Sequence, residues 1–305
     1  MKNQIALNWL VPLIAITSII TSGVGLFSQG GDGPFPFITI HGNTVEMYGR
    51  GIYHNDSLFV AALLRGTDAI TLFLSIPLLL VSYRFYRRGS IRGSILMTGM
   101  LMYFLYIGIT WTFSVFFNSL FLVYVALFSL SLFATIVAFT TFDIQMLSNK
   151  VSSGLPRRGL AIFMFIAGLG TLMLWLSELI GPLTTGQAPA NLGPYTTMFT
   201  HGFDSAVITP ATVITGIYLL RRKPLGYLLV APLLILCTNI GVVVIAQTIS
   251  QTLAGLVFPI GVYIGMIGSW VVMGGFAVGL AIAFFRKISS NMPSEETIHK
   301  LGVIT

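Results

Sequence analysis

The chain has 305 residues, of which 55% are hydrophobic and only 8% are charged. A soluble globular domain carries about 25% charged residues, so this composition excludes an ordinary soluble domain and indicates a membrane protein. The single cysteine, Cys237, excludes an internal disulfide and any zinc or redox site that is built from cysteine pairs.

Eight apolar runs follow one another along the chain, and each is long enough to cross a bilayer, which takes about 20 helical residues. The runs lie at residues 5–27, 57–83, 94–117, 120–142, 160–182, 194–220, 226–249 and 254–285. The first is long for a signal peptide, and the SQGGDG after it has no clear small-x-small cleavage site, so we expect it to be retained. The sequence therefore predicts an all-α, polytopic membrane helical bundle of about eight transmembrane helices.

Two segments outside these runs also carry a structural prediction. Residues 28–56 form a long outer loop, in which FITIHGNTVEMYG alternates around Gly42 and Asn43. This pattern predicts a small β-hairpin. Residues 288–305 form a tail, in which PSEETIHKLG predicts one short helix after its proline.

The basic residues gather on one side of the predicted membrane. If the N-terminus is cytoplasmic, all but two of the 16 lysines and arginines fall on the cytoplasmic side; Arg50 lies outside and Arg65 lies within a helix. This is the positive-inside pattern of a protein of the cytoplasmic membrane with both termini in the cytoplasm. It accounts for the formal net charge of +7 without a nucleic-acid partner.

The loop lengths predict an internal repeat. The outer turns run long, very short, long, very short, and the very short ones are expected around Asn118-Ser119 and Ser250-Gln251. The inner turns after the second and sixth runs, YRFYRRGSIRG and YLLRRKPLG, are both short and dibasic. A four-plus-four parallel pseudo-repeat would give this pattern, with residues 1–150 and 151–287 as its halves.

Matching motifs in the second and sixth runs favour the same repeat. Residues 65–68 read RGTD and residues 201–204 read HGFD, so both follow the pattern basic-Gly-x-Asp. Each motif is followed by a proline, Pro77 or Pro210, and then by a dibasic exit.

Ionisable residues inside or at the end of the runs are the candidates for a substrate or ion site, because a charge in hydrocarbon costs a few kcal/mol and needs a reason. The candidates are Arg65, Asp68, Glu178, His201 and Asp204. We expect the two motif-bearing helices to begin near Ser57 and Pro194, which puts Asp68 and Asp204 about 15 Å below the outer end.

Each candidate also has a purely structural interpretation. Arg65 and Asp68 are spaced for a local i, i+3 ion pair. His201 and Asp204 are spaced for a hydrogen-bonded pair, or for a metal pair, since an imidazole and a carboxylate one turn apart can share an ion. Glu178 lies where an aromatic belt is usual, so it is also explained by snorkelling to the interface.

The segment YGRGIYHNDS, residues 48–57, runs directly into the second apolar run. We expect five of its side chains to form an outer lid over the site: Tyr48, Arg50, Tyr53, His54 and Asp56. The alternative is an ordinary interfacial cap, with Asp56 or Ser57 as the helix N-cap.

Together with the RGTD that follows, this segment resembles an uncharacterised group of prokaryotic polytopic integral membrane proteins. The resemblance covers chiefly residues 48–90 and the LLRRKPLGYLL stretch. It implies the same membrane topology, and it transfers no activity because none is known for that group.

Several residues in the later runs are interpreted as packing elements. Thr238 and Asn239 suit hydrogen bonding between helices, and Pro210 and Pro259 are expected to kink their helices. Small-xxx-small faces, which allow close packing and an oligomer through the last helix, are formed by Gly261, Gly265, Gly268, Gly275 and Gly279.

Three functions are compatible with these features. The first is a small-molecule or ion transporter with an outward-facing site at the second and sixth helices. The second is an intramembrane enzyme, metal-dependent or not, that acts on lipid at the outer leaflet. The third is a non-catalytic membrane subunit or sensor. A water path on the cytoplasmic side favours the first, a closed inner half with a metal outside favours the second, and the absence of a cavity favours the third. The expected partners are the lipid bilayer and a small molecule or ion, and the sequence specifies no cofactor.

Overall fold

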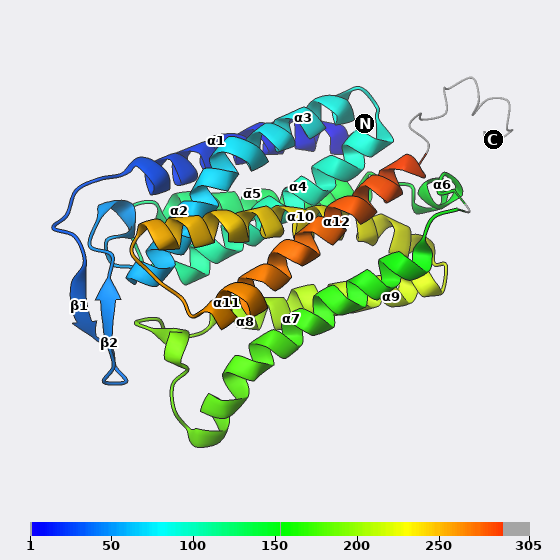
Figure 1. Cartoon of the computed structure of the whole chain (residues 1–305). Coiled ribbons are helices and arrows are strands. Elements are labelled where there is room, and N and C mark those ends of the chain that lie inside the picture. Colours follow the sequence, from blue (N-terminus) through cyan, green and yellow to red (C-terminus); the bar gives the residue numbers. More distant parts are fainter. Residues whose placement is uncertain (1, 153, 289–305) are drawn as a thin grey trace, which may run out of the picture.

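The computed structural model describes residues 2–152 and 154–288 as long helices with one small sheet (Figure 1). Eight helical spans in this part of the chain are long and apolar enough to cross a membrane. They lie at Ile5–Phe27, Leu58–Arg87, Ile91–Ser114, Phe121–Thr140, Arg157–Thr185, Phe199–Leu220, Pro224–Leu253 and Ile260–Arg286. The prediction of an all-α polytopic bundle of eight spans is therefore confirmed. The short helix expected in PSEETIHKLG lies outside the described residues.

Five spans are continuous helices and three are interrupted by one π-helical turn. The continuous helices are α1 (Lys2–Phe27), α4 (Ile91–Ser114), α5 (Phe121–Thr140), α7 (Arg157–Thr185) and α10 (Pro224–Leu253). The interrupted spans are α2 (Leu58–Ile70), η2 (Thr71–Ser75) and α3 (Ile76–Arg87); α8 (Phe199–Phe203), η4 (Asp204–Ile208) and α9 (Thr209–Leu220); and α11 (Ile260–Val262), η5 (Tyr263–Ile267) and α12 (Gly268–Arg286). A short helix, α6 (Ile144–Asn149), lies between α5 and α7.

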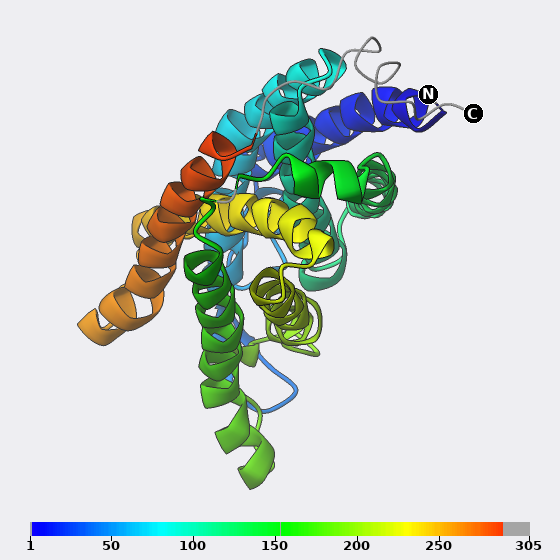
Figure 2. The same cartoon turned by 90° about the vertical axis from the view of Figure 1, so that its right-hand side faces the viewer.

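Helices α4 and α10 form the centre of the bundle. Helix α4 packs against α3, α5 and α10, and α10 packs against α2, α4, α9 and α12. In the most apolar 18-residue stretch of each span, 72% of the α4 residues and 61% of the α10 residues are buried. In the span that ends in α12, the value is 17%. Figure 2 shows the same arrangement from the end that carries the N-terminus, with α10 inside and α12 and α7 at the periphery.

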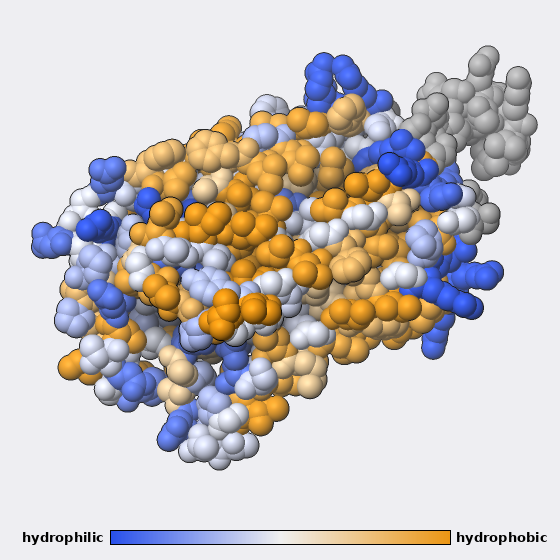
Figure 3. All heavy atoms as spheres, in the orientation of Figure 1, coloured by the Kyte–Doolittle hydropathy of each residue, from blue (hydrophilic) through white to orange (hydrophobic). Residues whose placement is uncertain are grey.

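The surface is divided along the long axis of the bundle. Figure 3 shows a broad apolar band between two ends at which hydrophilic atoms gather. One end carries the β-hairpin and is called the hairpin end; the opposite end is called the basic end. The helix termini at the basic end carry Arg84, Arg87, Arg88, Arg92, Arg157, Arg158, Arg221, Arg222, Lys223, Arg286 and Lys287.

The predicted β-hairpin is present between the first two spans. Strands β1 (Phe35–Ile38) and β2 (Thr44–Met47) pair antiparallel, with Phe35 opposite Met47 and Ile38 opposite Thr44. Gly42 in the connecting turn has φ +79°, a left-handed conformation that glycine adopts without a steric penalty.

The prolines explain two of the three π-helical turns. Pro77 and Pro210 are the second residues of α3 and α9, directly after η2 and η4. A proline lacks the N–H that an α-helix needs and crowds the preceding turn, so a widened turn before it relieves the conflict. Pro259 is different, because it is the N-cap of α11 and lies outside the helix. The kink predicted at Pro259 is therefore wrong, as is the helix start predicted at Pro194, since α8 begins at Phe199.

The spans that contain Pro77 and Pro210 have the same secondary structure, residue by residue, from the π-helical turn onward. Segments 71–75 and 204–208 are both π-helical, segments 76–87 and 209–220 are both α-helical, and the next helices start at 91 and 224. Every pair of numbers differs by 133, as 204 does from 71.

The packing at the turn follows the same offset. A Cβ on Gly93 would meet Phe85 and Tyr86, and a Cβ on Gly226, 133 residues later, would meet Tyr218 and Leu219. The offset also has a consequence for the acids. Asp204 opens its π-helical turn and corresponds to Thr71, so the two basic-Gly-x-Asp motifs are displaced by three residues from the helical match.

Arg222 occupies a backbone conformation that the matched position fills with glycine. It has φ +55° and is the one residue other than glycine with positive φ in the part of the chain that the structure describes. Gly89, 133 residues earlier, has φ +74° in the same turn. A left-handed conformation costs a residue with a Cβ roughly 1–2 kcal/mol.

We expect Arg222→Gly to raise the free energy of unfolding by about 0.5–1 kcal/mol, since relief of this strain outweighs the added freedom of glycine in the unfolded chain. Gly89→Ala should lower it by about 1 kcal/mol for the converse reason. Thermal unfolding of the detergent-solubilised protein measures both changes. A lower midpoint temperature for Arg222→Gly would contradict the interpretation.

Candidate functional site

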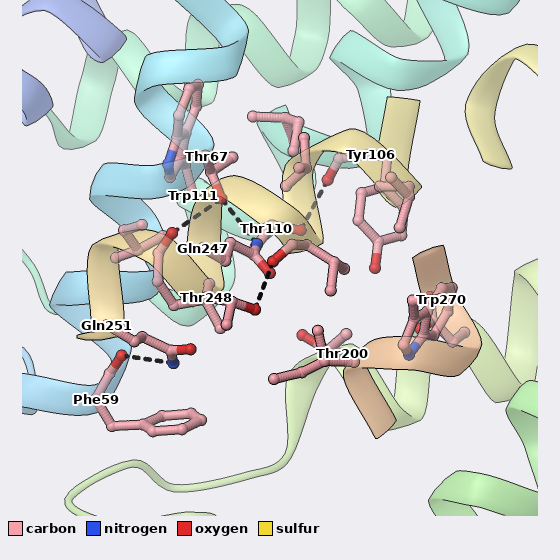
Figure 4. A pocket seen from close by; sticks show the side chains of 18 of the residues that line it. Phe59, Thr67, Tyr106, Thr110, Trp111, Thr200, Gln247, Thr248, Gln251 and Trp270 are labelled. Carbon is pink, nitrogen blue, oxygen red and sulfur yellow. Dashed lines mark hydrogen bonds between the residues drawn. The ribbon is translucent and has the colours of Figure 1, made fainter. Parts of the chain in front are cut away.

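A cavity of about 200 Å³ lies in the hairpin half of the bundle, between the α2, α4 and α10 helices and the interrupted spans around η4 and η5 (Figure 4). Six aromatic side chains line it: Phe59, Tyr106, Trp111, Trp175, Phe258 and Trp270. Its polar lining consists of Thr67, Thr110, Thr200, Asp204, Gln247, Thr248 and Gln251. The cavity is therefore mostly apolar, with a few hydrogen-bonding groups and a single acid, as is common for small-molecule sites.

Asp204 is the acid of this cavity. The residue is 3% exposed, and its Oδ2 accepts a hydrogen bond of 3.1 Å from Trp175 Nε1. Asp204 also lines a second cavity of about 40 Å³, which shares Tyr106 and Trp270 with the first. Among the described residues that line the two cavities there is no lysine, arginine or histidine.

His201 and Glu178 form a pair beside the cavity. His201 Nε2 lies 3.1 Å from Glu178 Oε2, and the two side chains are 12% and 25% exposed. The His201 ring also packs on Trp175, with 4.0 Å between ring centroids. His201 and Asp204 thus have separate hydrogen-bond partners, Glu178 and Trp175, while Trp175 contacts both residues. No group of three histidine, cysteine, aspartate or glutamate side chains that could hold a metal occurs in the described part of the chain.

Arg65 and Asp68 lie on the side of α2 that faces α1. Asp68 is completely buried, and its Oδ2 accepts a hydrogen bond of 2.9 Å from the Tyr53 hydroxyl. Arg65 Nη1 donates to the Gly25 carbonyl of α1 at 3.3 Å. Arg65 and Asp68 therefore use separate partners in place of the i, i+3 ion pair. The two residues with Gly25 and Tyr53 are called the α1 cluster.

The five candidate site residues are thus divided among three locations. Asp204 lines the 200 Å³ cavity, His201 and Glu178 lie beside it, and Arg65 and Asp68 belong to the α1 cluster. The division follows from the faces of α2. Thr67 points to the cavity, while its neighbour Asp68 points to α1.

The segment 48–57 does not line the cavity. Tyr48 and Arg50 line a separate groove of about 560 Å³ with Arg65, between α1, α2 and α10. His54 is exposed and contacts Phe35, with 5.5 Å between ring centroids. The segment packs down on the bundle rather than over the cavity, and Ser57 caps α2 by accepting from the Val60 N–H at 3.2 Å.

Hydrogen bonds to the Asp56 side chain join three loops at the hairpin end. Its side chain is completely buried, and Oδ1 accepts from the Phe116 N–H at 3.1 Å and from the Tyr195 hydroxyl at 2.9 Å. Its Oδ2 has no hydrogen-bond partner among the described residues. Burial raises the pKa of Asp56 from 3.8 to about 7, although both hydrogen bonds favour the ionised form.

A polar seam joins the second span to α10 and leads from the cavity into the bundle. Gln251 Nε2 donates to the Phe59 carbonyl at 3.4 Å, and Gln247 Nε2 donates to Thr67 Oγ1 at 2.9 Å (Figure 4). Further from the hairpin end, Ser75 Oγ donates to Asn239 Oδ1 at 3.3 Å.

The seam is close-packed and has a branch to α4. A Cβ on Gly66 would overlap the backbone of Ala246 and Gln247, so glycine is needed for this approach of α2 to α10. Between the Gln247–Thr67 and Ser75–Asn239 hydrogen bonds, the hydroxyl of Thr71 lies 2.8 Å from the hydroxyl of Tyr103 on α4. Thr67, Thr71 and Ser75 follow at intervals of four residues, which places them on one face of the second span.

The sequence interpretation missed Gln247 and Gln251. Gln251 was expected in a short outer turn, but α10 continues to Leu253 and keeps it in the helix. The signal was available in the spacing. Asn239, Gln247 and Gln251 are separated by eight and four residues, so the three amides share one face of α10.

Comparison of the chain with protein-family models, with curated proteins and with solved structures gives no match. The fold and the apolar band define a multi-pass helical membrane protein. Its functional assignment therefore depends on the geometry of the cavity and the seam.

The α1 cluster predicts opposite effects for two glycines of the same helix. A Cβ on Gly25 would overlap the Asp68 carboxylate and the Tyr53 hydroxyl, whereas a Cβ on Gly23 would meet nothing within 4 Å. We expect Gly25→Ala to lower the free energy of unfolding by about 1–3 kcal/mol and Gly23→Ala to raise it by about 0.5–1 kcal/mol. Equal effects of the two substitutions in thermal unfolding would refute the predicted contact.

Asp56 predicts that stability falls as the pH rises. Because the folded-state pKa, about 7, exceeds the ordinary 3.8, the folded protein binds more protons than the unfolded chain between these values. The Asp56 contribution to the free energy of unfolding should thus be largest near pH 4 and decline up to about pH 7, by at most about 1.4 kcal/mol per pH unit. Thermal midpoints of Asp56→Asn should decline less steeply than those of the wild type. Parallel slopes would exclude this role of Asp56.

Proposed function

We propose that this protein is a small-molecule transporter of the cytoplasmic membrane, with the 200 Å³ cavity as its substrate site. The observation that carries the proposal is the polar seam, which continues from the cavity toward the basic half of the bundle. A site that only binds a ligand from one side needs no such continuation. A transporter needs polar groups on both sides of its site, so that water and substrate can be accommodated in either direction.

The interrupted spans support movement around the cavity. Two of the π-helical turns, η4 and η5, contribute Asp204 and Ile267 to its lining, and η2 follows Thr67 by one turn. Such turns weaken the regular hydrogen-bond ladder of a helix and are frequent at functional sites.

We interpret the offset of 133 residues as part of a four-plus-four parallel repeat. Within each proposed half, the second span contacts the first and third spans, and the third contacts the fourth. The third spans of the two halves, α4 and α10, contact each other at the centre. The distribution of charge supports an orientation in which the basic end faces the cytoplasm.

The remaining alternatives receive less support from the geometry. The absence of a cavity would favour a non-catalytic subunit or sensor, and the described residues enclose a cavity. For the enzyme, the expected acid, base or metal-holding residues are His201, Asp204, Asp68 and Glu178. Of these four, Asp204 lines the cavity, His201 and Glu178 lie beside it, and Asp68 belongs to the α1 cluster.

Accessibility of single cysteines tests transport without a known substrate. In a Cys237→Ala background, Thr248→Cys reports on the cavity and Ser75→Cys on the deep end of the seam. The proteins are labelled with a membrane-impermeant thiol reagent in right-side-out and in inverted vesicles. We expect Thr248→Cys to react from the hairpin side, and Ser75→Cys to react from both sides.

The control is Phe73→Cys, which lies in the same π-helical turn as Ser75 but is 66% exposed on the apolar surface. It should stay unlabelled from either side, because a lipid-facing thiol lacks water. Labelling of Thr248→Cys from one side with no labelling of Ser75→Cys from the other would refute alternating access and support a one-sided binding protein.

A further inference from the structure

Asp204 is a carboxylate without a resident counter-charge. It is the one acid among the described residues that line the cavity, and no basic side chain lines the cavity with it. His201, one turn earlier, is already paired with Glu178. An ionised carboxylate in an apolar environment is costly unless a proton or a cation neutralises it.

The aromatic lining suits a cation. Trp175 and Trp270 lie with 6.5 Å between ring centroids, and Trp175 donates its N–H to Asp204. Tyr106 and Trp270 lie together on one side of the cavity, opposite Thr67 and Gln247 (Figure 4). The faces of such rings attract organic cations, and the attraction strengthens when the cation leaves water.

We propose that the cavity binds a small organic cation, a quaternary ammonium or a protonated amine with apolar substituents, against Asp204, in exchange for a proton. This inference rests on the proposed function in taking the cavity as the substrate site. When the cation enters, the O–H bond of the neutral carboxyl breaks, its electron pair stays on the carboxylate and the proton passes to water. The site is neutral before and after, so cation and proton exclude each other.

The other titratable groups around Asp204 do not take part in the exchange of cation and proton. Tyr106 on α4 and Cys237 on α10 line the adjoining 40 Å³ cavity with Asp204 and are neutral at physiological pH. Glu178 on α7 and His201 on α8 are paired with each other. The lining residues from α2, α9 and α12 in the described chain include no titratable side chain. For a transporter, mutually exclusive binding of cation and proton means exchange of one for the other across the membrane.

Choline and its neutral isostere 3,3-dimethyl-1-butanol test the charge requirement on the purified, detergent-solubilised full chain. We expect choline to raise the thermal midpoint and the isostere to leave it unchanged, since only what binds the folded state stabilises it. Over the pH range in which Asp204 is protonated, the affinity for choline should fall about tenfold for each unit by which the pH is lowered. Calorimetry in buffers of different ionisation enthalpy should then detect one proton released for each choline bound.

Three variants locate the effect. Asp204→Asn keeps an acceptor for the Trp175 N–H, and we expect it to weaken choline binding at least tenfold and to remove its pH dependence. Trp270→Leu should weaken binding and leave the pH dependence in place. Asp68→Asn is the matched control, a buried acid of the second span outside the cavity, and should bind choline as the wild type does; Asp56→Asn replaces it if the Asp68 variant does not fold.

Equal stabilisation by the isostere, no choline effect at any pH, or unchanged choline binding by Asp204→Asn would each overturn the inference. An equal loss of binding in Asp68→Asn and Asp204→Asn would also overturn it, because the effect would then be structural. None of these results bears on the labelling of Ser75→Cys from two sides, so the organic-cation site and the transport function can fail independently.

Discussion

The need of buried polar groups for partners inside the protein governs the arrangement around the second span. In a bilayer, water does not satisfy such groups, so each must find its partner on a neighbouring helix. Asp68 and Arg65 do so on the α1 side, and Thr67 does so on the α10 side. The second span is thereby held from two directions, and glycines at both contacts, Gly25 and Gly66, allow the backbones to approach. The cavity forms where this span, α10 and the interrupted spans separate at the hairpin end.

The number of spans and the hairpin could be predicted from the sequence because both depend on local patterns. A run of about 20 apolar residues crosses a bilayer whatever its neighbours are. The β-hairpin alternates with a period of two around a glycine turn. The start of α8 at Phe199 was harder to predict, since its N-cap position is occupied by Met198, whose side chain makes no cap hydrogen bond.

Which face of each helix is buried could not be predicted in the same way. In a helix that is apolar all round, hydrophobicity has no period that separates a lipid face from a buried one. Asp68 and Asp204 could be recognised as buried acids, but their directions depend on which helix packs on each side. The cavity joins Asp204 to aromatic side chains from four spans and from the connection before the last span, and no local pattern brings Trp111, Trp175 and Trp270 together. The amides of α10 were the part of the site that spacing alone could have revealed.

The position of α12 decides from where a ligand meets the cavity. One of its walls is formed by Val262, Ile267 and Trp270, which belong to the least buried of the eight spans, and by Phe258, which directly precedes that span. The outer face of this wall carries Ile260 and Ile264, which are 73% and 70% exposed, so no other described part of the protein covers it there. For a molecule that dissolves in the bilayer, the relevant concentration is then the one reached in the membrane, which can exceed the aqueous concentration by its partition coefficient. A modest intrinsic affinity would suffice for such a molecule, and selectivity would begin with partitioning, before any side chain makes contact.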